Sequence, residues 1–566
     1  MDPDNRLWEI EEGVPQLLDP FIQKFLAGRR SLIQEEKSQQ HDSNLCKALP
    51  EVAIRARKIV SRICSATRLE HGGIPHPSLM SDPDRERLES SDLWKIVRNL
   101  PKGSLLYGHL PVMIDIDFLI DQALATPGIY ISAPNPLITH HDFENATFFF
   151  HYMPAHQAEV EGSKDKPELS LWSDSYEPSA SLDLQTAAAL FPHGGQIGFR
   201  DWLKRRCAVS SENHPCGRRT SPISNLFNHY LPIVSPLFHH EPILRVCLRR
   251  IFSQLVADKI NYVEFRLAFD FQYTREGAEK PEADYFAWFH IFQEEISLFQ
   301  SLDEGKNFYG ARIIWAAPRN LSNKDIGESM KECIIMKKRF PALICGFDLL
   351  GQESTERPLH NLLPILFWFR GRCAEETVNI PFIFSAGQSM GAGDDADGNL
   401  FDAVLLSSRR ISQGLSLYTH PLLIDIIKKK NILIECSPTS NKGFGFTNSF
   451  QAHPIPALLS REVSVALCND SPGIFGNGEN GLSSEFWQAL LAFQNMGLTG
   501  LAMLVENSIR WSCYEDQTQS EWGSDIQEGI LGEGEKAARL HAFYAEFESF
   551  CQWVVREYGE KYPVEV

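Results

Sequence analysis

Eight short apolar segments, each of strand length, recur along this chain, and helical stretches separate most of them. Examples of those helical stretches are residues 243–258, 324–339 and 420–430. Repeated alternation of strand and helix indicates a parallel sheet, and eight such units predict an α/β fold, a (β/α)8 TIM barrel. The active site of such a barrel lies at the carboxyl ends of its strands. The predicted strands cover residues 104–110, 261–269, 310–317, 342–351, 380–387, 409–414, 431–438 and 463–470.

The chain is too long for one compact domain, and its length of 566 residues suits a barrel with appendages. Helical periodicity over residues 14–26 and 46–67 predicts an N-terminal helical region spanning 1–95, and the barrel is predicted over 96–566. A Gly- and Pro-rich piece, residues 71–83, predicts a linker.

The connection between the first two strands is far longer than a simple unit needs. It contains a polar tract of low predicted order at 159–183 and a cluster of Cys, Gly and Pro at 205–222. Loops this long are usually functional lids or insertions, so we expect a long insertion after strand one, at about residues 125–225.

Charge and composition exclude several kinds of partner. The formal net charge of −19 repels phosphate backbones, so nucleic acid is a poor partner. No apolar stretch approaches the roughly 20 residues of a membrane span, and the first residues show no basic segment followed by an apolar one. The twelve Cys are scattered without a CxxC pair. These features predict a cytoplasmic protein with free thiols and no membrane partner.

One stretch, IPFIFSAGQSMGAGDD at residues 380–395, stands out as the centre of a site. Its apolar strand is followed at once by Ser385 and other small residues, then by Gln388 and a loop rich in Gly and Asp. A buried strand that opens into a loop with close backbone approach is how α/β enzymes present reactive groups.

This stretch resembles the HAGE segment of the adenosine deaminase family, and specifically its growth-factor-like branch. Further segments resemble that family's motifs in the same order, from about residue 100 to 512. They are LPKGSLLYGHL (100–110), GFDLLGQES (346–354), NLFDAVLLSSRRISQGLSLYTHP (399–421), ILIECSPTSN (432–441), VALCNDSPGIFG (465–476) and ENSIRWS (506–512). The resemblance implies the barrel, an insertion after strand one, and a homodimer formed through the N-terminal helices.

The resemblance also places the family's zinc and catalytic positions on residues of this chain. The four zinc-ligand positions are occupied by Tyr107, His109, Ser385 and Asp470; the proton-shuttle Glu, the catalytic His and the substrate-binding Asp are replaced by Gln388, Gln413 and Ser471. A catalytic zinc needs several His and carboxylate ligands, and glutamine does not exchange protons near neutral pH. We therefore expect no zinc cofactor, or weak zinc binding at most, with His109 and Asp470 as relic zinc positions.

Three residues are the predicted catalytic groups: Asp470, His109 and Tyr107. A buried Asp without a metal should have a raised pKa and could act as a general acid or base. The alternative for Asp470 and His109 is that they are relics satisfied by hydrogen bonds, and Tyr107 could simply fill space. The predicted substrate-binding groups are Gln388, Gln413, Ser385, Ser471 and Glu353, the last of which could instead fix loops. The adjacent pairs His140–His141 and His239–His240 are predicted at the surface or at helix caps.

Three functions stay open at this point. The first is a repurposed, metal-independent enzyme that uses acid–base chemistry on a small molecule, for example in isomerisation, cyclisation or elimination. The second is a catalytically inactive pseudo-deaminase that binds a nucleoside-like ligand or a partner. The third is residual adenosine deaminase activity, a hydrolase reaction.

Overall fold

The computed structural model of the chain describes residues 8, 11–70, 82–153, 170–209, 226–391, 393–493 and 495–564. The chain divides into two compact units, Met1–Glu51 and Val52–Val566. Most of the predicted linker at 71–83, and most of the Cys, Gly and Pro cluster at 205–222, lie outside the described residues.

The first unit is helical. It contains α2 (Pro20–Ser38) and α3 (Ser43–Ala48), and neither helix has a buried residue. Pro20 stands in the first turn of α2, where a missing backbone N–H costs nothing. The division falls after Glu51, at the start of α4 (Glu51–Glu70), whereas the sequence places the start of the barrel region at residue 96.

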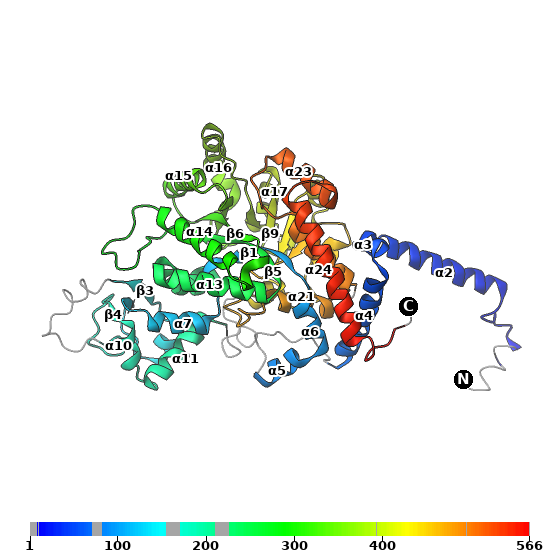
Figure 1. Cartoon of the computed structure of the whole chain (residues 1–566), viewed down its shortest axis with the longest axis horizontal. Coiled ribbons are helices and arrows are strands. Elements are labelled where there is room, and N and C mark those ends of the chain that lie inside the picture. The colour runs from blue at the N-terminus through cyan, green and yellow to red at the C-terminus, as the bar shows by residue number, and fades with distance from the viewer. Residues whose placement is uncertain are drawn as a thin grey trace. The chain divides into compact units, whose positions relative to one another are not determined.

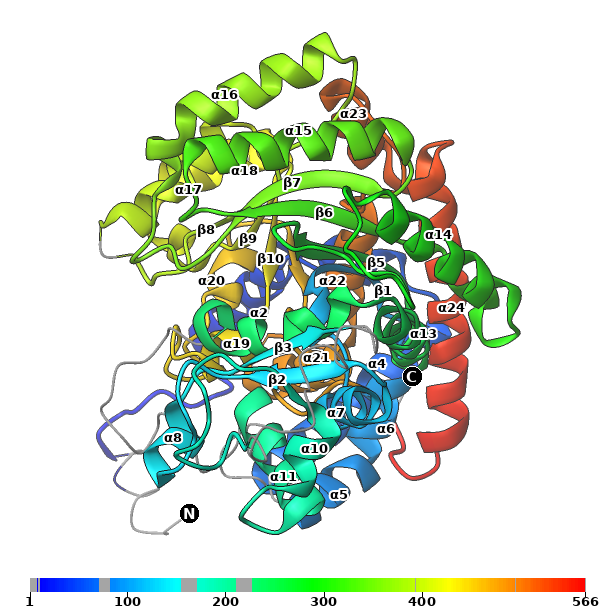
Figure 2. The same ribbon diagram turned by 90° about the vertical axis from the view of Figure 1, so that its left-hand side faces the viewer.

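The second unit is built on eight parallel strands in two four-stranded sheets (Figure 2). All eight predicted strands are confirmed, although the last five are shorter than predicted. In spatial order they are β1 (Gly103–His109), β5 (Ile260–Ala268), β6 (Gly310–Pro318) and β7 (Ile344–Leu350), then β8 (Phe384–Ala386), β9 (Arg410–Gln413), β10 (Leu433–Cys436) and β11 (Val465–Leu467).

Contacts at both seams join the two sheets into the predicted TIM barrel. A parallel bridge pairs Phe347 of β7 with Phe382 just before β8. At the other seam, the backbone N–H of His109 at the end of β1 donates to the carbonyl of Asp470 after β11, at 2.9 Å. These strands are almost wholly buried, as expected where helices cover a parallel sheet.

Helices surround the barrel, and the three predicted examples are confirmed as α13, α15 and α18 (Figures 1 and 2). Side-chain caps start several of the surrounding helices: for example, Ser322 accepts from the N–H of Asp325 in α15, and Asp394 accepts from that of Asp397 in α17. The helices are α5 (Asp82–Ser90), α6 (Asp92–Asn99), α13 (Glu241–Ala257), α14 (Phe286–Ser301), α15 (Asn323–Arg339), α16 (Leu359–Glu375), α17 (Asp395–Leu405), α18 (Pro421–Lys429), α19 (Pro438–Gly443), α20 (Ile455–Leu459), α21 (Gly481–Ala492), α22 (Leu498–Arg510), α23 (Gln519–Glu528) and α24 (Glu535–Tyr558).

The long connection between β1 and β5 forms a small subdomain with an antiparallel sheet in the order β3-β2-β4. Its elements are α7 (Ile116–Ala125), β2 (Ile129–Ser132), α8 (His140–Asn145), β3 (Phe149–Tyr152), β4 (Leu182–Asp183), α10 (Leu184–Ala189) and α11 (Gly195–Cys207). The prediction of low order is wrong for residues 170–183. There Trp172 is buried against Phe143 and Trp202, and its indole N–H donates to the carbonyl of Ala187.

Three short turns then lead back to the barrel: η4 (Leu226–Tyr230), α12 (Leu231–Val234) and η5 (Ser235–His239). In the part of the chain that the structure describes, no helix combines the length and the apolar character needed to cross a membrane.

Charged residues fill part of the barrel interior. Arg266 and Arg410, on β5 and β9, are fully buried and ion-paired with Glu435 of β10, and Arg410 also pairs with Glu264 of β5. Arg266 makes a further pair with Asp348 of β7 at 2.8 Å. Breaking such a buried pair typically costs about 3–5 kcal/mol, so this network holds strands from both sheets together.

Candidate active site

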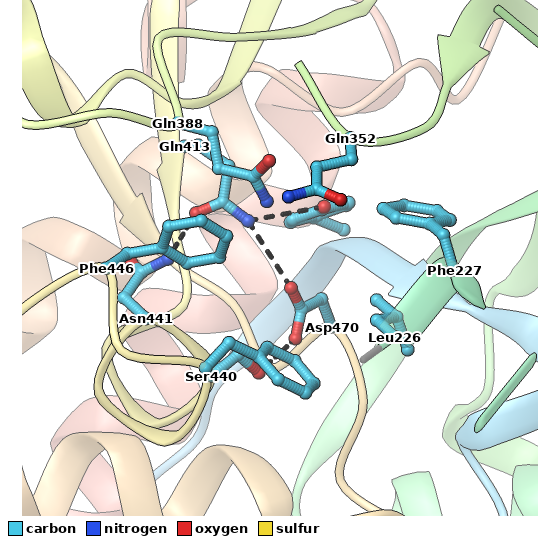
Figure 3. Close-up of a pocket in the computed structure, with 11 residues that line it drawn as sticks. Leu226, Phe227, Gln352, Gln388, Gln413, Ser440, Asn441, Phe446 and Asp470 are labelled. Carbon is cyan, nitrogen blue, oxygen red and sulfur yellow. Dashed lines mark hydrogen bonds between the residues drawn. The ribbon is translucent and has the colours of Figure 1, made fainter. Parts of the chain in front are cut away.

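The side chains singled out from the sequence converge at the carboxyl ends of the barrel strands. Tyr107 and His109 come from β1, and Glu353 follows β7. Ser385 lies on β8 with Gln388 just after it, Gln413 is the last residue of β9, and Asp470 and Ser471 follow β11. Tyr107, Gln388, Gln413 and Asp470 line one pocket together (Figure 3).

Gln413 is the hub of a buried hydrogen-bond network (Figure 3). Its Nε2 donates to the hydroxyl of Tyr107 at 3.3 Å and to Oδ2 of Asp470 at 3.4 Å, and its Oε1 accepts from Nδ2 of Asn441. These partners fix which end of the amide faces Asp470. The backbone of Gln413 has φ 75°, a left-handed conformation that is strained for a residue with a side chain.

Asp470 is a buried carboxylate held by hydroxyl groups. Its Oδ1 accepts from the hydroxyls of Ser440 and Ser471, the latter at 2.9 Å. Burial raises the pKa of Asp470, and the hydrogen bonds from the two serines and the positive charge of Arg266 only partly oppose that rise. Asp470 is therefore a carboxyl group whose affinity for a proton exceeds that of an ordinary Asp.

His109 is buried, and its Nε2 has no hydrogen-bond partner among the described residues. Its ring lies between the rings of Tyr107, at 5.3 Å, and Phe227, at 5.5 Å. Burial, and after it the nearby Arg266, lowers the pKa of His109 to about 3, so the imidazole is neutral near pH 7. Burial also raises the pKa of Tyr107 far above its ordinary value, which keeps this phenol protonated.

Ser385 and Glu353 are engaged with other parts of the strand-end layer. The hydroxyl of Ser385 donates to Oδ2 of Asp348 at 2.9 Å. Glu353 accepts from the backbone N–H groups of Gly387 and Gln388 at 3.0 and 3.4 Å, which fixes the loop after β8. Burial raises the pKa of Glu353 to about 7.

Two cavities lie beside the rings of Tyr107, His109 and Phe227: Phe227 lines both, Tyr107 lines the smaller and His109 lines the larger. The smaller, of about 20 Å³, is lined by Tyr107, by the amides of Gln352, Gln388, Gln413 and Asn441, and by Asp470. The larger, of about 460 Å³, reaches His109 and Phe227 from the ends of β1, β5, β6 and β7. Its volume lies in the range of ligand pockets, so we take it as the chamber for a small molecule.

Several residues of this region were not predicted from the sequence. Arg266 and Asp348 are charged residues inside buried strands, and that contrast is a signal that could have identified them. Ser440 and Asn441 belong to a motif that was recognised, but their contacts depend on how α19 follows β10. Phe227 lies in the long connection, where no local pattern indicates its position.

The two histidine pairs differ. His140 and His141 are exposed at the start of α8, as predicted. The helix-cap placement is confirmed for His240, which is the N-cap residue of α13 and is buried there. His239 is half-buried rather than at the surface: it is the last residue of η5, stacks on Phe271 at 4.1 Å and lines the larger cavity. Their ring partners, Phe271 and Tyr152, are distant in sequence, so no local pattern predicts this burial.

The donor set at the four zinc-ligand positions does not fit a zinc ion. A serine hydroxyl and a tyrosine with a raised pKa stand where zinc needs nitrogen or carboxylate ligands, and both hydroxyls are hydrogen-bonded elsewhere. Among the described residues, no group of three or more His, Cys, Asp or Glu side chains is arranged to hold a metal ion. Absence of zinc itself stays a prediction.

Comparison with known proteins places this barrel in a family. The adenosine deaminase family model matches residues 223–528, just over half of the chain. Adenosine deaminase 2-A of Danio rerio is 24% identical over 478 residues, covering 82% of this chain and 87% of its own. Adenosine deaminase 2 of Dictyostelium discoideum is 26% identical over 503 residues, covering 89% and 85%. Among solved structures, a zinc-bound amidohydrolase of Burkholderia ambifaria covers 86% of this chain and 100% of its own, at 14% identity and a TM-score of 0.49. The chain belongs to the adenosine deaminase family.

Proposed function

We propose that this protein is a metal-independent enzyme that uses acid–base chemistry on a small molecule in the barrel mouth. The observation that carries the proposal is the buried carboxyl of Asp470, with its raised pKa, held beside amide and phenol donors at the strand ends. Groups with perturbed pKa values beside a cavity are typical of catalytic sites. Isomerisation, cyclisation and elimination need only proton transfer, which this set of groups can supply.

Each residue has a distinct role in this proposal. Asp470 in its ionised form removes a proton from the substrate and, once protonated, returns it at another atom. Tyr107, protonated at all relevant pH values, donates a hydrogen bond to a substrate oxygen or nitrogen. The free Nε2 of His109 binds a polar substrate atom on the side of the larger cavity.

The remaining site residues orient these three. Gln388 and Gln413 position the substrate through their amides, and Ser471 holds the carboxylate of Asp470. Glu353 acts through the loop that carries Gln388. Ser385 acts through Asp348, to which it donates.

An assay for deuterium uptake from D2O tests this function without knowledge of the substrate, because it detects any compound whose protons the enzyme exchanges. Chelator-treated protein is incubated with a mixture of small metabolites in D2O, and mass spectrometry detects compounds that gain deuterium or change mass. We expect at least one such compound, and we expect Asp470→Asn to slow the exchange by about 100-fold or more because the proton acceptor is lost. His109→Ala should slow it as well.

The matched control is Asp425→Asn, which removes an exposed carboxyl of α18 far from the strand ends and should exchange at the wild-type rate. Exchange that is unaffected by Asp470→Asn would remove this residue from the mechanism. Exchange by no compound would favour the second candidate, a pseudo-deaminase that binds a nucleoside-like ligand without turnover. That candidate is supported by the hydrogen bonds that already occupy both oxygens of Asp470.

The third candidate, residual adenosine deamination, is separated by elemental analysis and an adenosine-to-inosine absorbance assay. We expect less than stoichiometric zinc and no inosine. One zinc ion per chain together with inosine formation would overturn the proposed function.

We also propose a cellular location and an oligomeric state for the protein. We propose a cytoplasmic location, which fits ten cysteines of the described residues that are buried as free thiols. We also propose a homodimer, on the basis of family resemblance and of the exposed apolar side chains of α2. Nucleic acid and membrane are not among the proposed partners.

A further inference from the structure

The larger cavity of about 460 Å³ combines apolar walls with two carboxyl groups. Leu231, Pro236, Leu267, Phe271, Leu321 and Leu350 supply apolar surface. The carboxyl groups are those of Asp270, just past the end of β5, and of Glu356, in the loop after β7. A ligand that fills this cavity therefore meets apolar side chains over most of its surface and carboxyl oxygens at a few points.

Neither carboxyl group has an ion-pair partner within 4 Å among the described residues. Oε2 of Glu356 is also buried without any hydrogen-bond partner there. Glu356 is half-buried and Asp270 is exposed, and desolvation by the surrounding protein raises the pKa of both groups. An unpaired carboxylate in partly desolvated surroundings gains more from a cationic partner than an exposed one does.

The cation that lines the cavity is already neutralised. Arg266 pairs with Asp348 at 2.8 Å and with Glu435 at 3.0 Å, both fully buried. Its guanidinium also lies over the ring of Tyr107, at 4.3 Å. Because two carboxylates already compensate its positive charge, Arg266 is not available to pair with an anionic ligand.

A second arginine, Arg319, does not cancel the effect of burial on the nearby carboxyl groups. Its charge lowers the pKa of both Glu353 and Glu356, but burial has the larger effect on each. Its Nη2 donates to the backbone carbonyls of Leu349 and Ser385, at 3.1 and 3.3 Å. Carboxyl groups therefore outnumber arginines at the strand ends. The arginines are Arg266 and Arg319, and the carboxyl groups are those of Asp270, Asp348, Glu353, Glu356 and Asp470.

The aromatic side chains of the cavity add to this preference. His239 stacks on Phe271 with an interplanar angle of 2°, and Phe227 lies at the boundary with the smaller cavity. Burial lowers the pKa of His239 to about 3, so its ring is neutral near pH 7 and does not repel a cation. Aromatic faces attract ammonium groups, more strongly where water is excluded.

We propose that the small molecule bound in the larger cavity is a protonated amine with an apolar or aromatic body, its ammonium group held by Asp270 and Glu356. This inference rests on the proposed function only in taking the barrel mouth as the ligand site. Of the three proposed catalytic groups, His109 lines this cavity.

A set of three probes with the same phenyl ring and two-carbon chain tests the charge preference. Binding of phenethylamine, 2-phenylethanol and phenylacetate to the full-length protein is measured by isothermal titration calorimetry near pH 7.5. We expect the amine to bind about tenfold or more tightly than the alcohol, and the carboxylate to bind more weakly than either. The double variant Asp270→Asn/Glu356→Gln should bind amine and alcohol alike.

The control variant Asp303→Asn changes a carboxyl at a distance from the cavity, one that pairs only with Lys306, and should keep the preference for the amine. Equal binding of amine and alcohol by the wild type, tighter binding of phenylacetate, or no binding of any probe at millimolar concentration would each overturn the inference.

Binding and turnover fail separately in these experiments. If phenethylamine is preferred but Asp470→Asn leaves proton exchange in D2O unchanged, the inference on ligand class stands and the proposed mechanism does not. If exchange depends on Asp470 but the exchanging compounds carry no amine, the mechanism stands and the ligand class is wrong.

Discussion

The family resemblance assigns ionisable groups to the positions of Gln388, Gln413 and Ser471, which in this chain are neutral residues able to form hydrogen bonds. Gln413 connects Tyr107, Asp470 and Asn441 through a single amide, a task that needs one donor end and one acceptor end. Ser471 supplies one hydroxyl to Asp470. The site is therefore a closed network of neutral donors around one carboxyl, and changes of single residues in it should have separable effects.

The charge of Glu353 should make stability depend on pH. Its folded-state pKa of about 7 is above the value of an unfolded Glu, so it stabilises the fold at low pH, and this contribution is lost as pH rises towards 7. Glu353→Gln keeps an acceptor for the N–H groups of Gly387 and Gln388 without a buried charge. We expect the variant to be more stable than wild type by about 3 kcal/mol near pH 8.5, and by less than about 1 kcal/mol near pH 5.

Urea unfolding at both pH values measures this difference. Glu328→Gln, which removes an exposed partner of Lys331, is the control and should change stability by less than about 0.5 kcal/mol at either pH. A loss of stability at high pH in Glu353→Gln would show that the ionised carboxylate is favourable where it lies.

Restoring the family's residues should restore a metal site. The fivefold variant Tyr107→His, Ser385→His, Gln388→Glu, Gln413→His and Ser471→Asp presents His109, two introduced histidines and Asp470 at the four ligand positions. We expect about one zinc ion per chain by elemental analysis, against well under that in the wild type. Adding Asp470→Asn to the variant should reduce its zinc content, and a variant that gains none would show that the backbone at the ends of β1, β8 and β11 does not have the geometry of a zinc site.

At the scale of the elements, the sequence predicts the repeated strands and helices of the barrel but not the structure of the irregular segments. The strands and the three example helices follow from apolar periodicity, because each buries a face against neighbours that alternate in the same way. The order found in residues 170–183 depends on one buried indole, Trp172, whose partners Phe143 and Trp202 are distant in sequence. Such contacts between distant residues leave no local pattern.

The site followed the same rule. The strand-end residues were predictable because a barrel gathers strand ends, and the family motifs named them. The role of Ser385 was not, because it depends on which neighbour its side chain meets, here Asp348. For Glu353 the loop-fixing alternative is confirmed, but its partners, the backbone N–H groups of Gly387 and Gln388, were not predictable. The larger cavity depends on η4, α12 and η5, whose sequences show no regular periodicity.

The helix α2 should mediate the proposed dimer. Phe21, Phe25 and Leu32 lie along one side of the helix at spacings of four and seven residues and are at least 58% exposed. We expect the wild type to have twice the 64.1 kDa mass of one chain by light scattering, and Phe21→Glu/Phe25→Glu to be a monomer. Gln34→Glu, on the opposite side of the helix, should remain a dimer. A wild-type monomer, or a dimeric double variant, would remove α2 from the interface.

At the scale of the whole molecule, stability should be independent of metal. The barrel interior is held by ion pairs between arginines and carboxylates, and among the described residues no metal ligand set spans the strand ends. We expect a chelator to shift Tm by less than about 1 °C, because a ligand that does not bind cannot stabilise. The zinc-loaded fivefold variant is the positive control, and its Tm should fall with the chelator. A fall of several degrees in the wild type would reveal a resident metal.

The ion pairs that Arg410 forms with Glu264 and Glu435 bear on which residues of the barrel can change during evolution. Since these charges lock the strands below the mouth, residues above them could be exchanged without the chain losing its shape. The residues that hold the strands together are therefore different from the residues that form the site at the strand ends. Substitutions at the strand ends therefore leave these ion pairs in place.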